Sequence, residues 1–108
     1  MSGAANPARG EAALIVGGEA VRLRPSFEAL VAAEEELGPL FALVERAAAG
    51  GLKVAEMAAL FWHCAERRDG LSRERIGAAI AERGLAGATP ALKVLLGQIL
   101  QGGSTGAP

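Results

Sequence analysis

The chain has 108 residues, of which 51% are hydrophobic and 21% are charged, which fits one domain with its own core and excludes disorder by composition. Its 11 Lys and Arg against 12 Asp and Glu give a net charge of -1, so no basic excess favours nucleic acid as a partner. One Cys cannot form an internal disulfide, and no apolar run approaches the roughly 18 residues of a membrane span. We therefore expect a soluble, cytoplasmic protein with no membrane partner.

The two ends of the chain differ in composition from its middle. Residues 1–8 are small and polar, and residues 102–108 are rich in Gly, Ser and Thr. Such ends lack the apolar side chains that would tie them to a core. We expect a flexible N-terminus over 1–8, a single domain over 9–101 and a flexible tail over 102–108.

Two apolar runs flank Gly17-Gly18, which is typical of a β-hairpin with a primed turn. Two registers are open. With Gly17-Gly18 as the loop, Leu14 faces Val21, whereas with Gly18-Glu19 as the loop, Leu14 faces Leu23. Both registers place the same apolar residues on the face that should pack on helices, namely Ala12, Leu14, Val16, Val21 and Leu23.

A first helix is expected over 27–37, because Ser26 can cap its start while Gly38 and Pro39 end it. Its apolar stripe is formed by Phe27, Leu30, Val31 and Leu37. Glu34 falls inside that stripe. We expect a partly buried carboxylate that meets Arg22, Arg24 or backbone donors where the hairpin crosses the helix, rather than a general base, because no partner for catalysis is evident.

The stretch 54–67 has no Gly or Pro and predicts the central helix of the core. Its apolar side chains fill an arc of about 200° on a helical projection. An arc this wide requires several neighbouring helices. The arc contains Val54, Met57, Ala58, Leu60, Phe61, Trp62, Cys64 and Ala65, and the strip left to water contains Ala55, Glu56, Ala59, His63, Glu66 and Arg67.

Three further helices complete the expected fold. One covers 40–49 between Pro39 and Gly50-Gly51. Its apolar face contains Leu40, Phe41, Leu43, Val44 and Ala47. Another covers 73–83, with Ser72 as its cap and Ile76, Ala79 and Ile80 on its buried side. The last begins at Thr89-Pro90, a capping hydroxyl followed by Pro, and runs to about 101. The fold class is therefore α+β, an N-terminal β-hairpin packed on a small bundle of about five α-helices.

His63-Cys64 is the only pair with potential as a nucleophile or metal ligand. Neighbours on a helix point about 100° apart, so the two side chains cannot act together. We expect His63 to point to water and Cys64 to pack in the core as a small hydrophobe. No spacing of Cys and His matches a zinc site. The sequence thus predicts no catalytic, cofactor-binding or metal residue and no enzyme.

Two binding surfaces can be proposed from the pattern. Trp62 lies at the edge of the apolar arc and, with the last helix, could form a groove for a partner helix; the alternative is that all of these side chains belong to the core. The groove residues are Trp62, Leu92, Leu95, Leu96, Ile99 and Leu100. A DNA-binding surface would instead use Arg73, Arg75 and Arg83, although Glu74 and Glu82 offset their charge.

The order of motifs resembles a known family. Arg9-Gly10-Glu11 precedes the hairpin, the first helix reads Phe27-x-x-Leu30-x-x-x-Glu34-x-x-x-Gly38, and Gly50-Gly51-Leu52 leads into the central helix. Over roughly residues 8–101 this resembles the tail assembly chaperones of gene transfer agents and related siphophages, also labelled tail tube proteins of gene transfer agents. One departure is Lys53-Val54, where the family usually has a capping Ser or Asp.

The resemblance implies a non-enzymatic role without a cofactor, in the bacterial host cell or transiently on assembling tails. Its members are similar to chaperones that coat the helical tape-measure protein before the tail tube polymerises. The implied partners are the tape-measure protein and the tail tube protein, with a homo-oligomer as a further option. The alternatives are a structural tail component that is retained in the particle and a small DNA-binding regulator.

Overall fold

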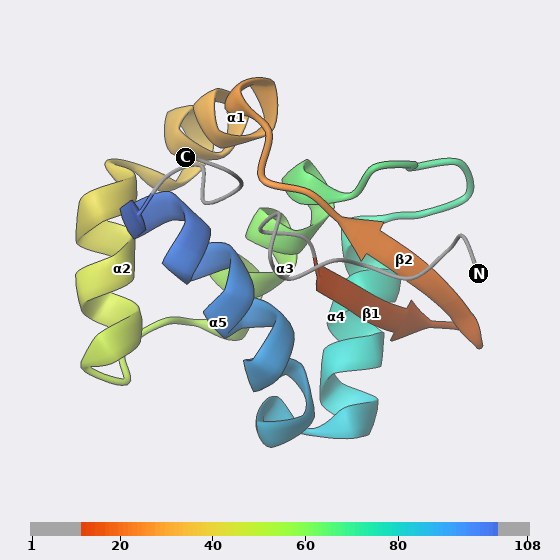
Figure 1. The fold of residues 1–108 in the computed structure, drawn as a ribbon. Helices are drawn as coiled ribbons and strands as arrows, with labels where there is room; N and C mark the ends of the chain where they lie inside the picture. Colours follow the sequence, from red (N-terminus) through yellow and green to blue (C-terminus); the bar gives the residue numbers. More distant parts are fainter. Residues whose placement is uncertain (1–11, 102–108) are drawn as a thin grey trace.

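The computed structural model describes residues 12–101. The expected flexible ends and the motif residues Arg9, Gly10 and Glu11 lie outside this range. The elements, in order, are β1 (Ala12–Val16), β2 (Glu19–Leu23), α1 (Phe27–Leu37), α2 (Leu40–Ala48), α3 (Val54–Cys64), α4 (Arg73–Arg83) and α5 (Leu85–Gln101). This confirms the α+β prediction, a hairpin followed by five helices (Figure 1).

The hairpin adopts the first of the two predicted registers. Leu14 pairs with Val21 and Val16 pairs with Glu19. Gly17 and Gly18 form the loop with φ values of 60° and 84°, which is the backbone that a primed two-residue turn requires. The face predicted to be apolar is buried at Ala12, Leu14, Val16 and Leu23 and half-buried at Val21. It rests mainly on α4 and α5 through β1.

Helix α3 lies at the centre of the core, as predicted. It packs between α1 and α4, and seven of its 11 residues are buried. Leu60 and Phe61 have no exposed surface. Three placements within the helix were wrong. Ala59 and His63, expected in the strip facing water, are buried, and Val54, expected in the core, is 43% exposed.

The C-terminal end of α3 comes three residues earlier than predicted. The chain leaves the helix at Ala65, which forms an antiparallel bridge with Leu23. The N–H of Arg24 donates to the carbonyl oxygen of Cys64 at 2.7 Å, and the N–H of Glu66 donates to the carbonyl oxygen of Arg22 at 2.9 Å. The outer edge of β2 thus supplies hydrogen bonds that compete with another helical turn. Local composition does not contain that information.

Helices α1 and α2 have the predicted starts, but α1 buries only part of its predicted stripe. Its Ser26 cap accepts a hydrogen bond from the N–H of Ala29 at 3.2 Å. The predicted stripe is half right: Leu30 and Leu37 are half-buried against the core, whereas Phe27 is 81% exposed. The fully buried residues of α1 are Ala29 and Ala33, which the prediction left out. These small Ala side chains face the core, and of the larger apolar side chains of α1 only Phe27 and Val31 are exposed. Helix α2 buries only Leu43.

Helix α4 matches its predicted bounds and its buried side chains, Ile76, Ala79 and Ile80. Helix α5 begins at Leu85 rather than at Thr89-Pro90, so Pro90 lies inside the helix. Thr89 does not cap; its hydroxyl donates to the carbonyl oxygen of Leu85 at 2.8 Å. This side-chain hydrogen bond lies in the turn just before Pro90, which has no backbone N–H to donate to the helix. Figure 1 shows α5 running between α2 and α4.

Candidate functional site

A charged cluster joins three helices around a buried histidine. The Nε2 atom of His63, on α3, lies 2.8 Å from Oε1 of Glu36, on α1. Arg73, at the start of α4, donates from Nη1 to Oε2 of the same carboxylate at 2.5 Å. The short contact between the ring nitrogen and a carboxylate assigns the Nε2 proton to His63 as the donor. The prediction that His63 points to water was wrong, because this non-local pairing holds the ring inward.

Trp62 is covered by cations rather than by another apolar helix. The guanidinium carbon of Arg68 lies 4.4 Å from the centre of the Trp62 ring, and that of Arg73 lies 4.8 Å from it. His63 meets the same ring edge-on with the ring centres 5.2 Å apart. Both cations are within the range of cation–π attraction. The cluster therefore ties α1, α3 and α4 together.

Electrostatics distinguish the two titratable groups beside His63. Hydrogen bonds from Arg73 and His63 hold the pKa of Glu36 below its usual value of 4.5. Burial raises the pKa of the Cys64 thiol to about 12. A thiol with that pKa stays protonated at neutral pH, and so it is a poor nucleophile. The arrangement fits a structural tie between helices better than an acid–base pair with a nucleophile.

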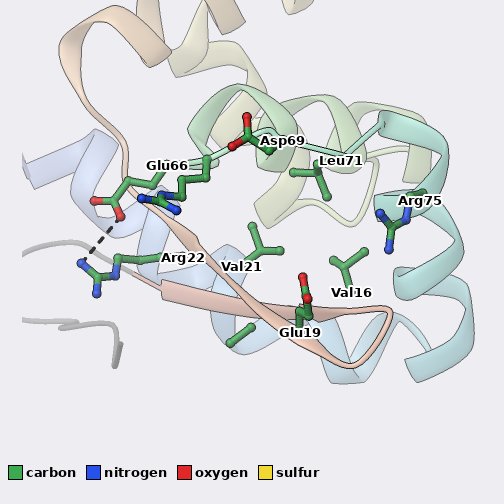
Figure 2. A pocket seen from close by; sticks show the side chains of 10 residues that line it. Val16, Glu19, Val21, Arg22, Glu66, Asp69, Leu71 and Arg75 are labelled. Carbon is green, nitrogen blue, oxygen red and sulfur yellow. Dashed lines mark ion pairs between the residues drawn. The ribbon is translucent and has the colours of Figure 1, made fainter. Parts of the chain in front are cut away.

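A hollow of about 730 Å³ lies between the hairpin and the segment that joins α3 to α4. Figure 2 shows Val16, Val21 and Leu71 pointing into it, with charged side chains around its rim. Arg22 pairs with Glu66 at 3.6 Å between Nη1 and Oε1, and Arg75 donates to the carbonyl oxygen of Gly70. The remaining charged side chains of the lining are Glu19, Arg67 and Asp69.

The charges around this hollow are balanced, three carboxylates against three guanidinium groups. A balanced rim gives no strong preference for an anion or a cation. Among residues 12–101, no group of three or more His, Cys, Asp or Glu side chains could hold a metal ion. The hollow therefore offers a binding surface without a defined ligand chemistry.

The structure does not gather the residues predicted to bind a partner helix into one groove. Leu95 is fully buried, and Leu92 is 9% exposed. Leu96 and Ile99 are half-buried, and Leu100 is 53% exposed. Helix α5 packs on β1, α4 and α2, whereas Trp62 faces Arg68 and Arg73. A binding role for these residues stays a prediction.

The structure also places the other candidate residues. Glu34 was expected to be partly buried, but it is exposed. Its partner is a backbone donor, one of the expected kinds, but it is the N–H of Leu40 at the start of α2 and not a group of the hairpin. Of the arginines considered for DNA, Arg73 and Arg75 already bind groups of the protein itself.

The most exposed aromatic side chains are ones that the sequence pattern assigned to the core. Phe27 is 81% exposed, and Phe41 is 66% exposed. Val31, one turn after Phe27, is 39% exposed. Helical periodicity found that these residues form apolar faces, but it gave no signal that the faces point outward. Large apolar side chains left in water on two helices that contact each other make these helices a candidate binding surface.

Comparison with known families decides what kind of protein has this surface. Residues 9–102 match the family described as "Phage tail tube protein, GTA-gp10". The chain belongs to this family. The match supports the predicted relation to gene transfer agents and phage tails, and it assigns the chain a tail-related role. Neither a curated protein nor a solved structure matches the chain.

Membership of the GTA-gp10 family bears on the expected partners as well. A tail-related role is consistent with other tail proteins as partners. Across the described residues, no helix has both the length and the apolar character that crossing a membrane requires.

Proposed function

We propose that this member of the GTA-gp10 family is a tail assembly chaperone, which binds the helical tape-measure protein in the cytoplasm of the bacterial host and catalyses no reaction. Such a tape measure is a long helix whose apolar surface stays exposed until the tube forms around it. A small domain with outward apolar side chains can cover that surface reversibly.

The observation that carries the proposal is the exposure of Phe27 and Phe41 in a protein of a tail family. A single exposed Leu is common on soluble proteins, whereas a Phe with four-fifths of its surface in water has a cost that a partner can remove. The buried Cys64 beside the Glu36–His63–Arg73 cluster supports the non-enzymatic part, because its thiol stays protonated at neutral pH and is a poor nucleophile.

Co-expression with the tape-measure protein of the same particle tests the proposal. We expect the chaperone to raise the soluble fraction of the tape-measure protein and to co-purify with it. The matched control is co-expression with an unrelated soluble protein in place of the chain. Failure of the two proteins to co-purify, with no gain in solubility over the control, would overturn the proposal.

The description of the family favours a second candidate, a tail tube subunit that stays in the finished particle. The two roles differ in what remains after assembly. Mass spectrometry of purified particles should find a tube subunit in many copies, since a tube is built by repetition of one subunit. It should find a chaperone only in traces, because a chaperone leaves before the tube closes.

A further inference from the structure

We propose that the outward faces of α1 and α2 form one acidic docking surface for a basic amphipathic helix. The surface, called the α1–α2 face here, is defined by its apolar residues Phe27, Val31 and Phe41 and its acidic residues Glu28, Glu35 and Glu45. This inference rests on the proposed function for its biological setting, but its chemistry is independent of that setting.

The apolar part of this face has helical spacing. Phe27 and Val31 are four residues apart on α1, so they lie one above the other on the same side of the helix. That side is opposite the buried Ala29 and Ala33. An exposed apolar pair at this spacing is the kind of anchor that a second helix can pack against. Phe41 repeats the feature on α2, where the buried residue is Leu43.

The acidic residues of the α1–α2 face give it a preference for positively charged partners. Residues 27–48 contain five Glu and one Arg, a net charge of -4 in a chain whose total is -1. One of the five, Glu36, is paired with Arg73 of α4, so the other four Glu supply the charge of this segment. The single cation, Arg46, is already bonded to Glu56 at 2.7 Å. Glu28, Glu35 and Glu45 are exposed, and no ion pair joins any of them to another residue within 12–101.

The apolar and acidic residues of the α1–α2 face together determine which kind of partner helix it can bind. Apolar anchors one helical turn apart favour an apolar stripe on a partner helix, and unpaired carboxylates beside them favour Lys or Arg on its flanks. Nucleic acid and other polyanions are disfavoured by the same carboxylates. A basic amphipathic helix of another protein therefore fits this face by both shape and charge.

The test uses a synthetic helical peptide with a Leu stripe flanked by Lys, and a second peptide with Glu in place of each Lys. We expect the Lys peptide to bind the full chain and the Glu peptide to bind at least about tenfold more weakly. In a ¹H–¹⁵N titration, the shifts should centre on residues 27–45. Shifts centred on α5 and Trp62 instead, or equal binding of both peptides, would overturn the proposal.

Two substitutions make the test specific. Phe27→Ser should weaken binding of the Lys peptide by about tenfold or more, because it removes the largest apolar contact. Leu85→Ser is the matched control, since Leu85 is 55% exposed at the start of α5, away from the acidic residues. Equal losses in the two variants would overturn the proposal. Phe27 is exposed, so circular dichroism should show both variants folded.

The outcome is separable from that of the proposed function. If the tape-measure protein fails to bind while the Lys peptide binds at Phe27, the chaperone role fails and the α1–α2 face stands. If the tape-measure protein binds Phe27→Ser as well as the unmodified chain, the chaperone role stands and the α1–α2 face fails.

Discussion

The Oε2 atom of Glu34 accepts a hydrogen bond from the backbone N–H of Leu40 at 3.1 Å. A side chain near the end of α1 thus satisfies a free donor in the first turn of α2, where Pro39 provides no side-chain cap. The carbonyl oxygen of Glu34 also accepts the N–H of Gly38 at 2.9 Å. Glu34, which belongs to the Phe27-to-Gly38 pattern, therefore holds the turn between α1 and α2 through two hydrogen bonds.

Replacing Glu34 tests how much its side-chain hydrogen bond to Leu40 stabilises the fold. Glu34→Ala should lower the free energy of unfolding by about 1 kcal/mol, the usual cost of losing a helix cap. Glu34→Gln keeps an acceptor oxygen and is the matched control, with a smaller loss. Chemical denaturation of the three proteins measures the difference. If the Ala and Gln variants are equally stable, the hydrogen bond to Leu40 contributes nothing.

Gly38 should tolerate substitution poorly for a reason that involves no clash. Its φ is 90° and its ψ is -175°, a region of backbone space that is essentially restricted to Gly. A Cβ at this position would meet no atom within 4 Å, so the cost is conformational. We expect Gly38→Ala to lower the free energy of unfolding by about 1–3 kcal/mol. Gly77→Ala, in the interior of α4 and also without a close neighbour, should be neutral or stabilising.

The Glu36 cluster should make stability depend on pH in the acidic range. The folded-state pKa of Glu36 lies below the usual 4.5, so its contribution is present above that value and is lost as the pH falls through the folded-state pKa. The melting temperature should therefore fall as the pH is lowered through the usual value of 4.5 and below it. In Glu36→Gln, which cannot ionise, this fall should be shallower. Parallel curves for the two proteins would contradict the role of Glu36.

Cys64 should be inert in the folded protein. Burial and a pKa of about 12 leave about one thiol in ten thousand ionised at about pH 8. A thiol-reactive dye should label the native chain slowly and the denatured chain at once. The two rates can be compared in one absorbance experiment. Rapid stoichiometric labelling of the native protein would contradict the placement of Cys64 in the core.

Leu43 should provide most of the packing that holds α2 on the core. It is the only residue of α2 with a buried side chain, and it is fully enclosed. Leu43→Ala should cost about 2–5 kcal/mol in unfolding free energy. Amide exchange should increase first in α2, since few other contacts hold that helix. A loss spread evenly over all helices would indicate that α2 is held by other means.

The sequence predicted the elements whose signals are local. Ser26 and Ser72 cap α1 and α4 where expected, and Gly17-Gly18 forms the loop of one of the two predicted registers. These features depend on neighbouring residues alone. Local patterns therefore suffice for where most elements begin and for the turn of the hairpin.

Several of the errors involve distant partners. The pattern placed His63 in water because it could not reveal Glu36, 27 residues away along the chain. It extended α3 because it could not reveal the bridge between Ala65 and Leu23. It buried Phe27 because an apolar stripe does not state which side faces the core. The candidate docking surface was missed for that last reason.

The central claim is that the chain acts by covering an apolar helix of another tail protein. Sedimentation velocity on a mixture of the purified chain and a purified helical segment of the tape-measure protein tests it most directly. The account predicts a complex that forms with the unmodified chain and is weakened by Phe27→Ser but not by Leu85→Ser. Two components that sediment independently at every concentration would contradict it.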